Sequence, residues 1–254
     1  MDSQFWLRWV QRCQALVGAS LPNRCLLCHQ TIPRNEGTDL SRSGICSSCL
    51  TSAIYAGHCC LGCGKSLQVA AEFCGSCMAQ RPIKVIAPAS YHSMLGPLIP
   101  AIKYQAQFAA LPALADALAA RIVDLSEQHL LELPQVILPV PLHANRLRQR
   151  GYNQAWLIAK QLSQRLNIPL DDQLLCRTND TAAQAKLSGK QRRSNLAGAF
   201  ALTAPSPYQR IALVDDVVTT GSTINEIAKL FRVSAPSVQA WCLARAEAPR
   251  LLGQ

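Results

Sequence analysis

One segment, residues 211–223, constrains the fold of this 254-residue chain more than any other, because it combines a strand, two carboxylates and a helix start. Its first part, together with residue 210, is short and rich in branched apolar side chains, which is typical of a parallel strand buried on both faces. Asp215 and Asp216 follow the apolar run, so we expect them at the carboxyl edge of the sheet. Open α/β sheets bind their ligands at that edge.

The turn after this strand consists of Thr219, Thr220, Gly221, Ser222 and Thr223. It leads into a predicted helix over residues 224–231, whose free N–H groups would bind phosphate. Gly221 allows a close approach of the backbone to a ligand, and the hydroxyls add short donors. Because carboxylates repel phosphate, Asp215 and Asp216 must face the vicinal hydroxyls of a sugar, or a Mg²⁺ ion that those hydroxyls help to coordinate. The segment therefore predicts a cradle for ribose 5-phosphate.

The segment resembles the signature for 5-phosphoribosyl-1-pyrophosphate (PRPP) in type I phosphoribosyltransferases, in its strand, its Asp pair and its Thr-Gly-x-Thr turn. Two further stretches and an upstream cysteine-rich stretch extend the resemblance to the ComF family, from about Cys25 to Ala246. That family includes the GntX-type proteins and is associated with natural competence, the import of single-stranded DNA. The further stretches are Pro139–His143 with Arg150–Gln154, and Thr181–Ser188 leading to Arg192–Phe200.

The resemblance implies a type I phosphoribosyltransferase-like domain that binds PRPP with Mg²⁺. Asp215 and Asp216 would be its catalytic pair, and residues 219–223 would hold the 5-phosphate. Relatives that salvage purines carry an acidic residue where this chain has Thr219, and no segment here resembles a hood over a nucleobase. This departure leaves transfer to a free base without support, so whether the chain is an enzyme stays open.

Cysteines are concentrated in the first third of the chain: ten of the twelve precede residue 80. Eight of them form four Cys-x-x-Cys pairs, namely Cys25/Cys28, Cys46/Cys49, Cys60/Cys63 and Cys74/Cys77. This spacing lets both thiolates of a pair bind one tetrahedral zinc ion at about 2.3 Å, so eight cysteines predict two structural zinc ions. Joining consecutive pairs is our first choice, and a cross-brace of alternate pairs is the alternative. Cys59 could replace Cys60, and His29 or His58 could also be ligands.

These features divide the chain into an N-terminal helix over residues 1–20, a zinc-binding cysteine-rich module over 21–81, and a phosphoribosyltransferase-like domain over 82–254. Arg8 and Arg12 interrupt the apolar stretch 5–17, which also lacks a small-residue cleavage site, so we expect an amphipathic helix and no secretory signal. A membrane-surface helix is the alternative. No uncharged apolar run reaches about 18 residues, so no membrane span is expected. Zinc binding by reduced thiols then favours a cytoplasmic protein.

Strand and helix patterns alternate through the third part of the chain. Short β-branched runs predict strands, and apolar residues at helical spacing predict helices. The expected strands are 85–91, 136–140, 210–214 and 237–243, and the expected helices are 97–104, 111–125 and 154–166, besides 224–231. This alternation predicts an α/β fold, with a parallel sheet, right-handed crossovers and helices on both faces.

Positive charge is concentrated between residues 141 and 200, where ten Lys or Arg stand against three Asp in a chain of net charge +10. Such a surface favours a polyanion, either the pyrophosphate of PRPP or a single-stranded nucleic acid. The candidates are Arg146, Arg150, Lys186, Arg192 and Arg193. Tyr152 and Trp156 lie among them and would stack on bases if exposed. Trp156 also fits the apolar face of its predicted helix, which makes a core position the alternative.

Three functions are compatible with these features. The first is a competence protein that handles imported single-stranded DNA, with a PRPP-type pocket and with a helicase or recombination protein as partner. The second is an active phosphoribosyltransferase of unknown acceptor, in nucleotide or base salvage. The third is a regulator that binds PRPP and responds through its zinc module.

Overall fold

The computed structural model describes residues 23–32, 44–179, 198–232 and 237–247. The predicted N-terminal helix over residues 1–20 lies outside them. The predicted division of the remaining chain at residues 81 and 82 stays a prediction. Helix α3 (Gly75–Gln80) ends just before this point and strand β1 (Lys84–Ile86) begins just after it.

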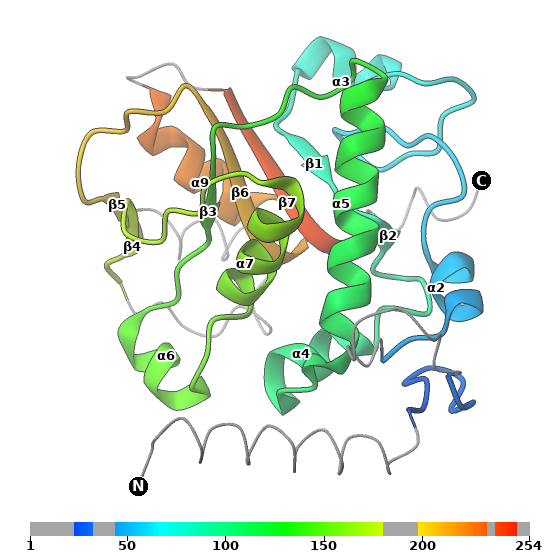
Figure 1. The fold of residues 1–254 in the computed structure, drawn as a ribbon. Coiled ribbons are helices and arrows are strands. Elements are labelled where there is room, and N and C mark those ends of the chain that lie inside the picture. Colours follow the sequence, from blue (N-terminus) through cyan, green and yellow to red (C-terminus); the bar gives the residue numbers. More distant parts are fainter. Residues whose placement is uncertain (1–22, 33–43, 180–197, 233–236, 248–254) are drawn as a thin grey trace, which may run out of the picture.

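A parallel sheet forms the centre of the molecule (Figure 1). Its strands run in the order β1-β7-β6-β3, and β2 pairs with β7 beyond the end of β1. The other strands are β2 (Ala89–Ser90), β3 (Val136–Pro139), β6 (Arg210–Val218) and β7 (Ser237–Arg245). The strand predicted over 85–91 is therefore two short pieces, β1 and β2, along one edge.

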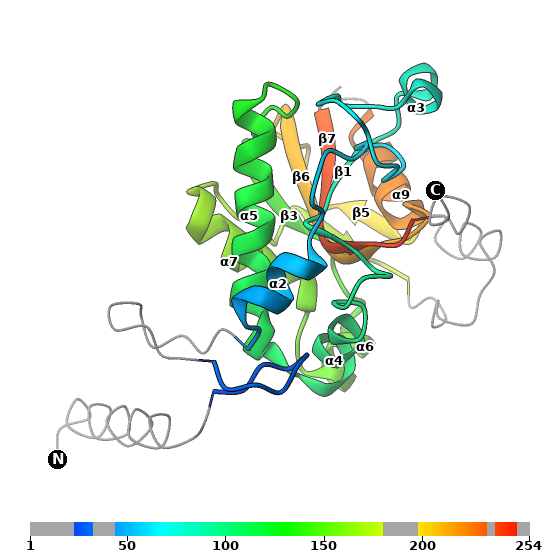
Figure 2. The ribbon, with the colours of Figure 1, turned by 90° about the vertical axis from the view of Figure 1, so that its right-hand side faces the viewer.

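Helices cover both faces of the sheet, as Figure 2 shows from the side: α5 (Leu111–Glu127) and α7 (Gln154–Leu166) on one face, α9 (Ser222–Leu230) on the other. Alternate residues of β6 divide between the two cores. Ala212 and Val214 pack in the core with α5 and α7, whereas Ile211 and Leu213 pack in the core with α9. This alternation explains why the strand is apolar at every position from Ile211 to Val214. The predicted α/β class, parallel sheet and two-sided helix cover are confirmed.

Strand β6 continues four residues past its predicted end at Val214, and this prediction was wrong. Its ladder with β7 runs on to the pair Val218 and Arg245, so Asp215 and Asp216 lie within a strand and not after one. Backbone pairing needs no apolar side chain, and both strands are long enough to extend the ladder beyond the apolar core. The carboxylates are thereby held by the β6–β7 ladder on the floor of the cleft described below.

The buried stripe of α7 does not include Trp156, which the sequence allowed as a core residue on the apolar face of this helix. Ala155, Ile158, Ala159 and Leu162 are buried, together with Gln154, while Trp156 is only half-buried and lies outside both cores. The indole N–H of Trp156 donates to Asp172 Oδ2 at 2.8 Å, and the Lys160 ammonium lies 5.1 Å from its ring. Neither of the two predicted roles for Trp156, core residue or free stacking platform, describes this position.

Five smaller elements complete the domain. Helices α4 (Leu98–Gln105) and α6 (Ala144–Arg150) lie beyond the carboxyl ends of the strands (Figure 1), and the short helix η1 (Phe108–Ala110) leads into α5. Strands β4 (Leu175–Arg177) and β5 (Phe200–Leu202) form a separate antiparallel pair. Among the described helices, none has the length and apolar character needed to cross a membrane.

The cysteine-rich module packs against the edge of the sheet and α5, and Figure 1 shows its helices α2 (Ser47–Ala53) and α3 on this side. Cys25, Ile45, Cys49, Ala53 and Leu61 belong to the same apolar core as α5. Backbone bonds cross the junction, from Val85 N to Leu61 O at 2.8 Å and from Tyr55 N to Pro88 O at 2.9 Å. The module is therefore packed against the rest of the protein and is not a separate unit on a linker.

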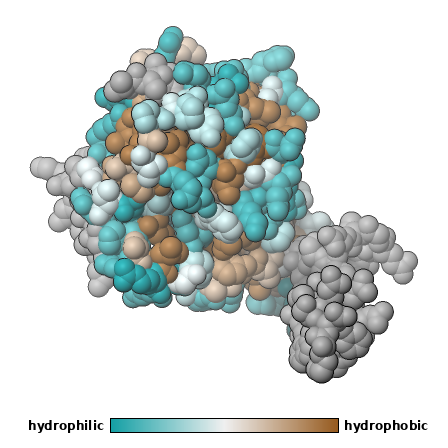
Figure 3. Space-filling model, turned by 60° about the vertical axis from the view of Figure 1, so that its left-hand side comes forward, coloured by the Kyte–Doolittle hydropathy of each residue, from teal (hydrophilic) through white to brown (hydrophobic). Residues whose placement is uncertain are grey.

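Hydrophilic and hydrophobic residues are mixed on the face of the molecule that Figure 3 shows, and neither kind gathers on one side of the described atoms. The exposed large apolar side chains are scattered through the sequence and include Val69, Met78, Met94, Tyr104, Val123, Leu133 and Leu147. Tyr104 alone among these seven lines the large cleft described below.

Candidate functional site

Two groups of four cysteines lie in the module, and each joins consecutive Cys-x-x-Cys pairs. One contains Cys25, Cys28, Cys46 and Cys49, and the other contains Cys60, Cys63, Cys74 and Cys77. Within each group all four sulfurs lie within 4.8 Å of one another. The sulfur positions therefore join consecutive Cys-x-x-Cys pairs, and the cross-brace alternative was wrong.

The sulfur spacing fits zinc. Four sulfurs about 2.3 Å from a tetrahedral ion lie about 3.8 Å from one another. The Cys28 and Cys46 sulfurs are 3.8 Å apart, and the Cys63 and Cys74 sulfurs are 3.6 Å apart. Cys59, His29 and His58 belong to neither group among the described residues. The sulfur of Cys59 instead accepts a hydrogen bond from Arg121 at 3.4 Å.

The two groups are built alike, with equivalent residues 35 positions apart in the first knuckle. Cys25 N donates to Gln30 O at 2.9 Å, and Cys60 N donates to Lys65 O at 2.8 Å. In each group the third cysteine is the N-cap of a short helix, Cys46 for α2 and Cys74 for α3. Backbone donation by Cys77 lowers the pKa of Cys74 to about 7, which favours the thiolate that zinc requires.

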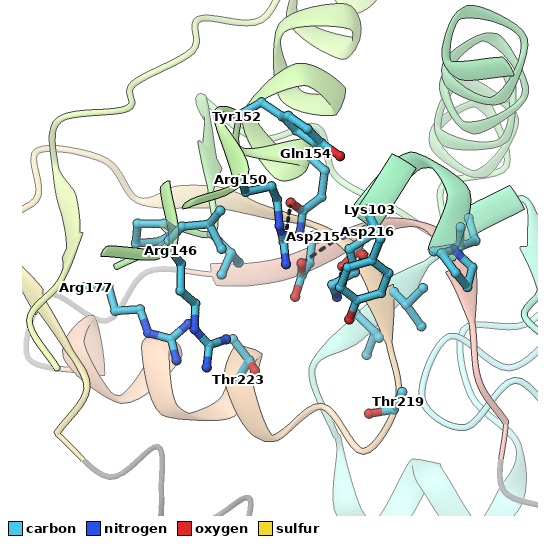
Figure 4. Close-up of a pocket in the computed structure, with 18 of the residues that line it drawn as sticks. Lys103, Arg146, Arg150, Tyr152, Gln154, Arg177, Asp215, Asp216, Thr219 and Thr223 are labelled. Atoms are coloured by element: carbon cyan, nitrogen blue, oxygen red, sulfur yellow. Dashed lines mark hydrogen bonds and ion pairs between the residues drawn. The ribbon is translucent and has the colours of Figure 1, made fainter. Parts of the chain in front are cut away.

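A cleft of about 1240 Å³ opens at the carboxyl ends of β3 and β6 (Figure 4). Its floor is residues 215–224, and its walls come from α4, α6 and the segment around Val140 and Gln154. All seven predicted residues of the 215–223 segment line it, namely Asp215, Asp216, Thr219, Thr220, Gly221, Ser222 and Thr223. The carboxylate pair and the hydroxyl-rich turn therefore share one cavity.

The turn before α9 has the geometry of an anion-binding loop. Gly221 is the N-cap of α9 with φ 69°, a left-handed conformation that glycine adopts without a steric penalty. The Thr220 and Ser222 hydroxyls are hydrogen-bonded to each other at 2.7 Å, so they lie side by side in the loop. Since the first-turn N–H groups of a helix have no partner within the helix, the loop offers several donors to a phosphate.

The two carboxylates differ in their surroundings. Asp216 is 3% exposed, and its Oδ2 lies 3.0 Å from the ammonium of Lys103 on α4. Asp215 is more exposed to solvent, and it accepts a hydrogen bond from the backbone N–H of Asp216 at 2.9 Å. Mg²⁺ prefers an octahedron of oxygen ligands. Because a lysine ammonium already neutralises Asp216, the pair does not fit Mg²⁺, which the sequence offered as the alternative to the hydroxyls of a sugar.

Desolvation of its carboxylate, reinforced by the charge of Asp216, raises the pKa of Asp215 to about 8 although Lys103 acts in the opposite direction. The folded protein thus keeps a proton that the unfolded chain, with a carboxyl pKa of about 4, releases between about pH 4 and pH 8. The free energy of unfolding should therefore fall as the pH rises through this window. Asp215→Asn should remove this part of the pH dependence.

Urea unfolding of both proteins at pH 5 and pH 8 measures the effect. Asp172→Asn serves as the control, since hydrogen bonds from Gln173 and Trp156 lower the pKa of that carboxyl and it does not titrate between these pH values. The same pH dependence in wild type and Asp215→Asn would contradict the assignment.

Besides Lys103, three arginines reach the cleft. Arg146 and Arg150, both predicted, project into it from α6, and Arg177 reaches it from β4 (Figure 4). Arg150 donates to Gln154 Oε1 at 2.7 Å, and its guanidinium lies 5.4 Å from the Tyr104 ring. The other predicted cations, Lys186, Arg192 and Arg193, lie outside the described residues. Strands β4 and β5, which pair with each other, lie before and after the stretch of chain that contains these three residues.

Tyr152 has a structural position and not the exposed one that base stacking would need. Its hydroxyl donates to Ile102 O at 2.7 Å and accepts from Ala106 N at 3.3 Å. Its ring packs edge-on against Phe108, with the ring centres 4.8 Å apart. The side chain therefore ties the carboxyl-terminal end of α4 to the segment between α6 and α7.

Sequence reasoning missed Lys103, Tyr104 and Arg177 as residues of the cleft. Lys103 is the one charged residue of α4, whose sequence is otherwise apolar or uncharged, and this isolation was a usable signal. Arg177 follows two apolar residues of β4, which was not predicted as a strand. Tyr104 carried no signal, because its importance comes only from the neighbouring α6.

Together these features define a parallel α/β protein with a hydroxyl-rich loop at a helix start beside a carboxylate pair, on one chain with two four-cysteine groups. The chain belongs to the ComF family. It is 41% identical over 232 residues to Competence protein F of Haemophilus influenzae, covering 88% of this chain and 97% of that protein. It is 35% identical over 229 residues to the DNA utilization protein YhgH of Escherichia coli K12, covering 89% and 98%. No protein-family model matches the chain.

Adenine phosphoribosyltransferases are among the solved structures similar to this chain. The enzyme from Leishmania tarentolae has a TM-score of 0.35 and 16% identity, over 57% of this chain and 74% of that chain. The enzyme from Trypanosoma brucei, in complex with AMP, pyrophosphate and ribose-5-phosphate, has a TM-score of 0.37 and 11% identity, over 61% and 73%.

Proposed function

We propose that this chain binds a phosphoribosyl ligand of the PRPP type in the cleft and handles imported single-stranded DNA in natural competence. The observation that carries the ligand class is the shared cavity of the 219–223 loop and the two carboxylates. The names of its relatives, Competence protein F and DNA utilization protein, support the role. A competence helicase or a recombination protein is the partner that this role requires.

Each part of the ligand has matching groups in the cleft. The N–H groups at the start of α9 and the hydroxyls of the loop hold the 5-phosphate, as helix N-termini do for anions. The Asp pair accepts hydrogen bonds from ribose hydroxyls, and Arg146 with Arg150 faces the pyrophosphate. The zinc module, with two structural ions held by reduced thiols, favours the cytoplasm.

Phosphoribosyl transfer to an unknown acceptor is the second candidate function. The Asp pair, the phosphate loop and cleft arginines supply groups that would hold the ribose and draw charge from a departing pyrophosphate. Release of pyrophosphate from PRPP in the presence of candidate acceptors, at a rate that Asp215→Asn lowers, would support transfer. PRPP binding without turnover would leave a binding protein.

The first test is fluorescence anisotropy of a labelled single-stranded oligonucleotide titrated with zinc-loaded protein, with and without PRPP. We expect a dissociation constant of about 1 μM or lower at moderate salt, which is at or beyond the tight limit of non-specific binding. Adding PRPP should change this affinity. If PRPP did not change the affinity for DNA, the cleft would have no part in DNA binding. Absence of binding would remove the DNA role and leave the second candidate.

Arg192→Ala with Arg193→Ala should weaken this DNA binding and flatten its salt dependence. For a single strand, the slope of log affinity against log salt falls by about 0.7 for each phosphate that the protein no longer neutralises. Lys84→Ala with Arg210→Ala is the matched control, since these cations begin β1 and β6 at the end of the sheet away from the cleft. An unaltered slope in the first variant would place the DNA surface elsewhere.

A further inference from the structure

A cation belonging to the protein already occupies the carboxylate end of the cleft. Lys103 Nζ lies 3.0 Å from Asp216 Oδ2 and 3.4 Å from Asp216 Oδ1, so the ammonium is shared by both oxygens. The Asp216 side chain is 4% exposed and that of Lys103 is 31% exposed. Figure 4 shows Lys103 reaching from α4 toward Asp216, beside Asp215.

The backbone that carries Lys103 is fixed on both sides of it. Ile99 and Ile102 bury the inner face of α4 in the core with α5. The Tyr152 hydroxyl bonds to Ile102 O on one side of Lys103 and to Ala106 N on the other. The ammonium is therefore presented to Asp216 by an anchored helix, and it is not a loose surface side chain that happens to lie nearby.

The pairing leaves Asp216 dependent on Lys103. Its Oδ2 is buried close to Lys103, and it accepts no well-directed hydrogen bond from any residue that the structure describes. A buried acceptor without a directed donor is costly, so the ammonium of Lys103 is the group that compensates this oxygen. The charge of Asp216 is thus neutralised, while the more exposed Asp215 beside it lines the cleft.

We propose that Lys103 takes the place of a divalent cation in this cleft, so that the ribose 5-phosphate part of a ligand binds without Mg²⁺. Lys103 neutralises Asp216, and the more exposed Asp215 beside it accepts a hydrogen bond from a ribose hydroxyl. The same ammonium excludes a metal ion from the carboxylates by like-charge repulsion. This inference rests on the proposed ligand class and adds the residue that decides its metal requirement.

Calorimetric titration with ribose 5-phosphate tests the proposal, because this probe lacks the pyrophosphate that chelates Mg²⁺ by itself. The buffer is freed of divalent ions by resin before the zinc-loaded protein is added, since a soluble chelator would also remove zinc. Wild type should bind equally well with and without Mg²⁺. Lys103→Met should bind about tenfold or more weakly in metal-free buffer, as expected when a charge-assisted hydrogen bond is removed, and should regain affinity with Mg²⁺.

Two control variants test whether the effect depends on the positive charge at position 103. Lys103→Arg keeps the positive charge and should remain independent of Mg²⁺. Lys160→Met removes an exposed lysine of α7 that lies over Trp156 outside the cleft, and it should behave as wild type. A wild-type protein that binds ribose 5-phosphate only with Mg²⁺ would overturn the proposal.

A second measurement uses the metal alone and needs no organic ligand. Titration with Mn²⁺, followed by electron paramagnetic resonance, should find no site in wild type that depends on Asp216. Lys103→Met should gain one site, and Lys103→Met with Asp216→Asn should lose it. A Mn²⁺ site at Asp216 in wild type, or none in Lys103→Met, would refute the role of Lys103. Failure of wild type to bind ribose 5-phosphate in either buffer would instead refute the proposed ligand class.

Discussion

Removal of zinc should unfold residues 21–81 while the parallel sheet of the domain stays folded. Structural zinc sites contribute apparent free energies of about 10 to 16 kcal/mol, more than a module of this size obtains from apolar burial. The module adds only a few residues to the core with α5, and it has just two short helices among its described residues. The sheet has its own cover from α5, α7 and α9.

Circular dichroism and limited proteolysis, with and without a strong chelator, measure this unfolding, and added zinc should reverse it. Proteolysis should then cut within the module first and spare β3, β6 and β7. A module that keeps its protease resistance after complete zinc removal would show that packing on α5, and not the metal, holds it.

Adjacent cysteines provide a matched pair of variants for the same point. Cys60 belongs to the second four-cysteine group, whereas Cys59 lies outside it and contacts Arg121. Cys60→Ser should reduce the zinc content from about two ions to about one and destabilise the protein. Cys59→Ser should retain both ions, and loss of an ion there would assign Cys59 as a ligand.

Asp215→Asn with Asp216→Asn should weaken PRPP binding by about tenfold or more, because a hydrogen bond to a charged carboxylate contributes about 1.5 to 3 kcal/mol. The domain should stay folded. Asn keeps the shape of both side chains, and the backbone ladder of β6 with β7 does not depend on the carboxylates. Lys103 can turn to solvent when its partner is neutral, since it is already 31% exposed.

Calorimetry with PRPP measures this decrease in affinity, and thermal unfolding confirms that the variant is folded. Asp116→Asn with Asp124→Asn is the matched control, since both carboxylates are exposed on α5 and neither lines the cleft. Wild-type affinity in the first variant would mean that the ribose hydroxyls are held elsewhere, and the cradle assignment would fail.

Sequence patterns located several elements closely. The helix predicted over 154–166 is α7 (Gln154–Leu166), and the strand predicted over 136–140 is β3 (Val136–Pro139). Both have strong local signals, with a cap or a proline at their ends. Predicted boundaries were less accurate where the apolar run ends before the strand does, as in β6, whose backbone stays in the strand beyond Val214.

The sequence by itself determined the features whose residues are close in the chain. Two intervening residues hold the sulfurs of each Cys-x-x-Cys pair near one ion, and the 219–223 turn is continuous with the start of α9. Such features depend on local backbone geometry, which composition and spacing specify. The carboxylate pair was found in the same way, as neighbours after an apolar run.

Only the tertiary structure decided which distant groups meet. Lys103 and Asp216 are 113 residues apart, and their contact depends on α4 lying across the carboxyl end of β6. The consecutive pairing of the cysteines and the half-exposed position of Trp156 were likewise settled by packing. These contacts result from many small burial and pairing energies summed over the sheet, α5 and α7, and no single stretch of sequence encodes that sum.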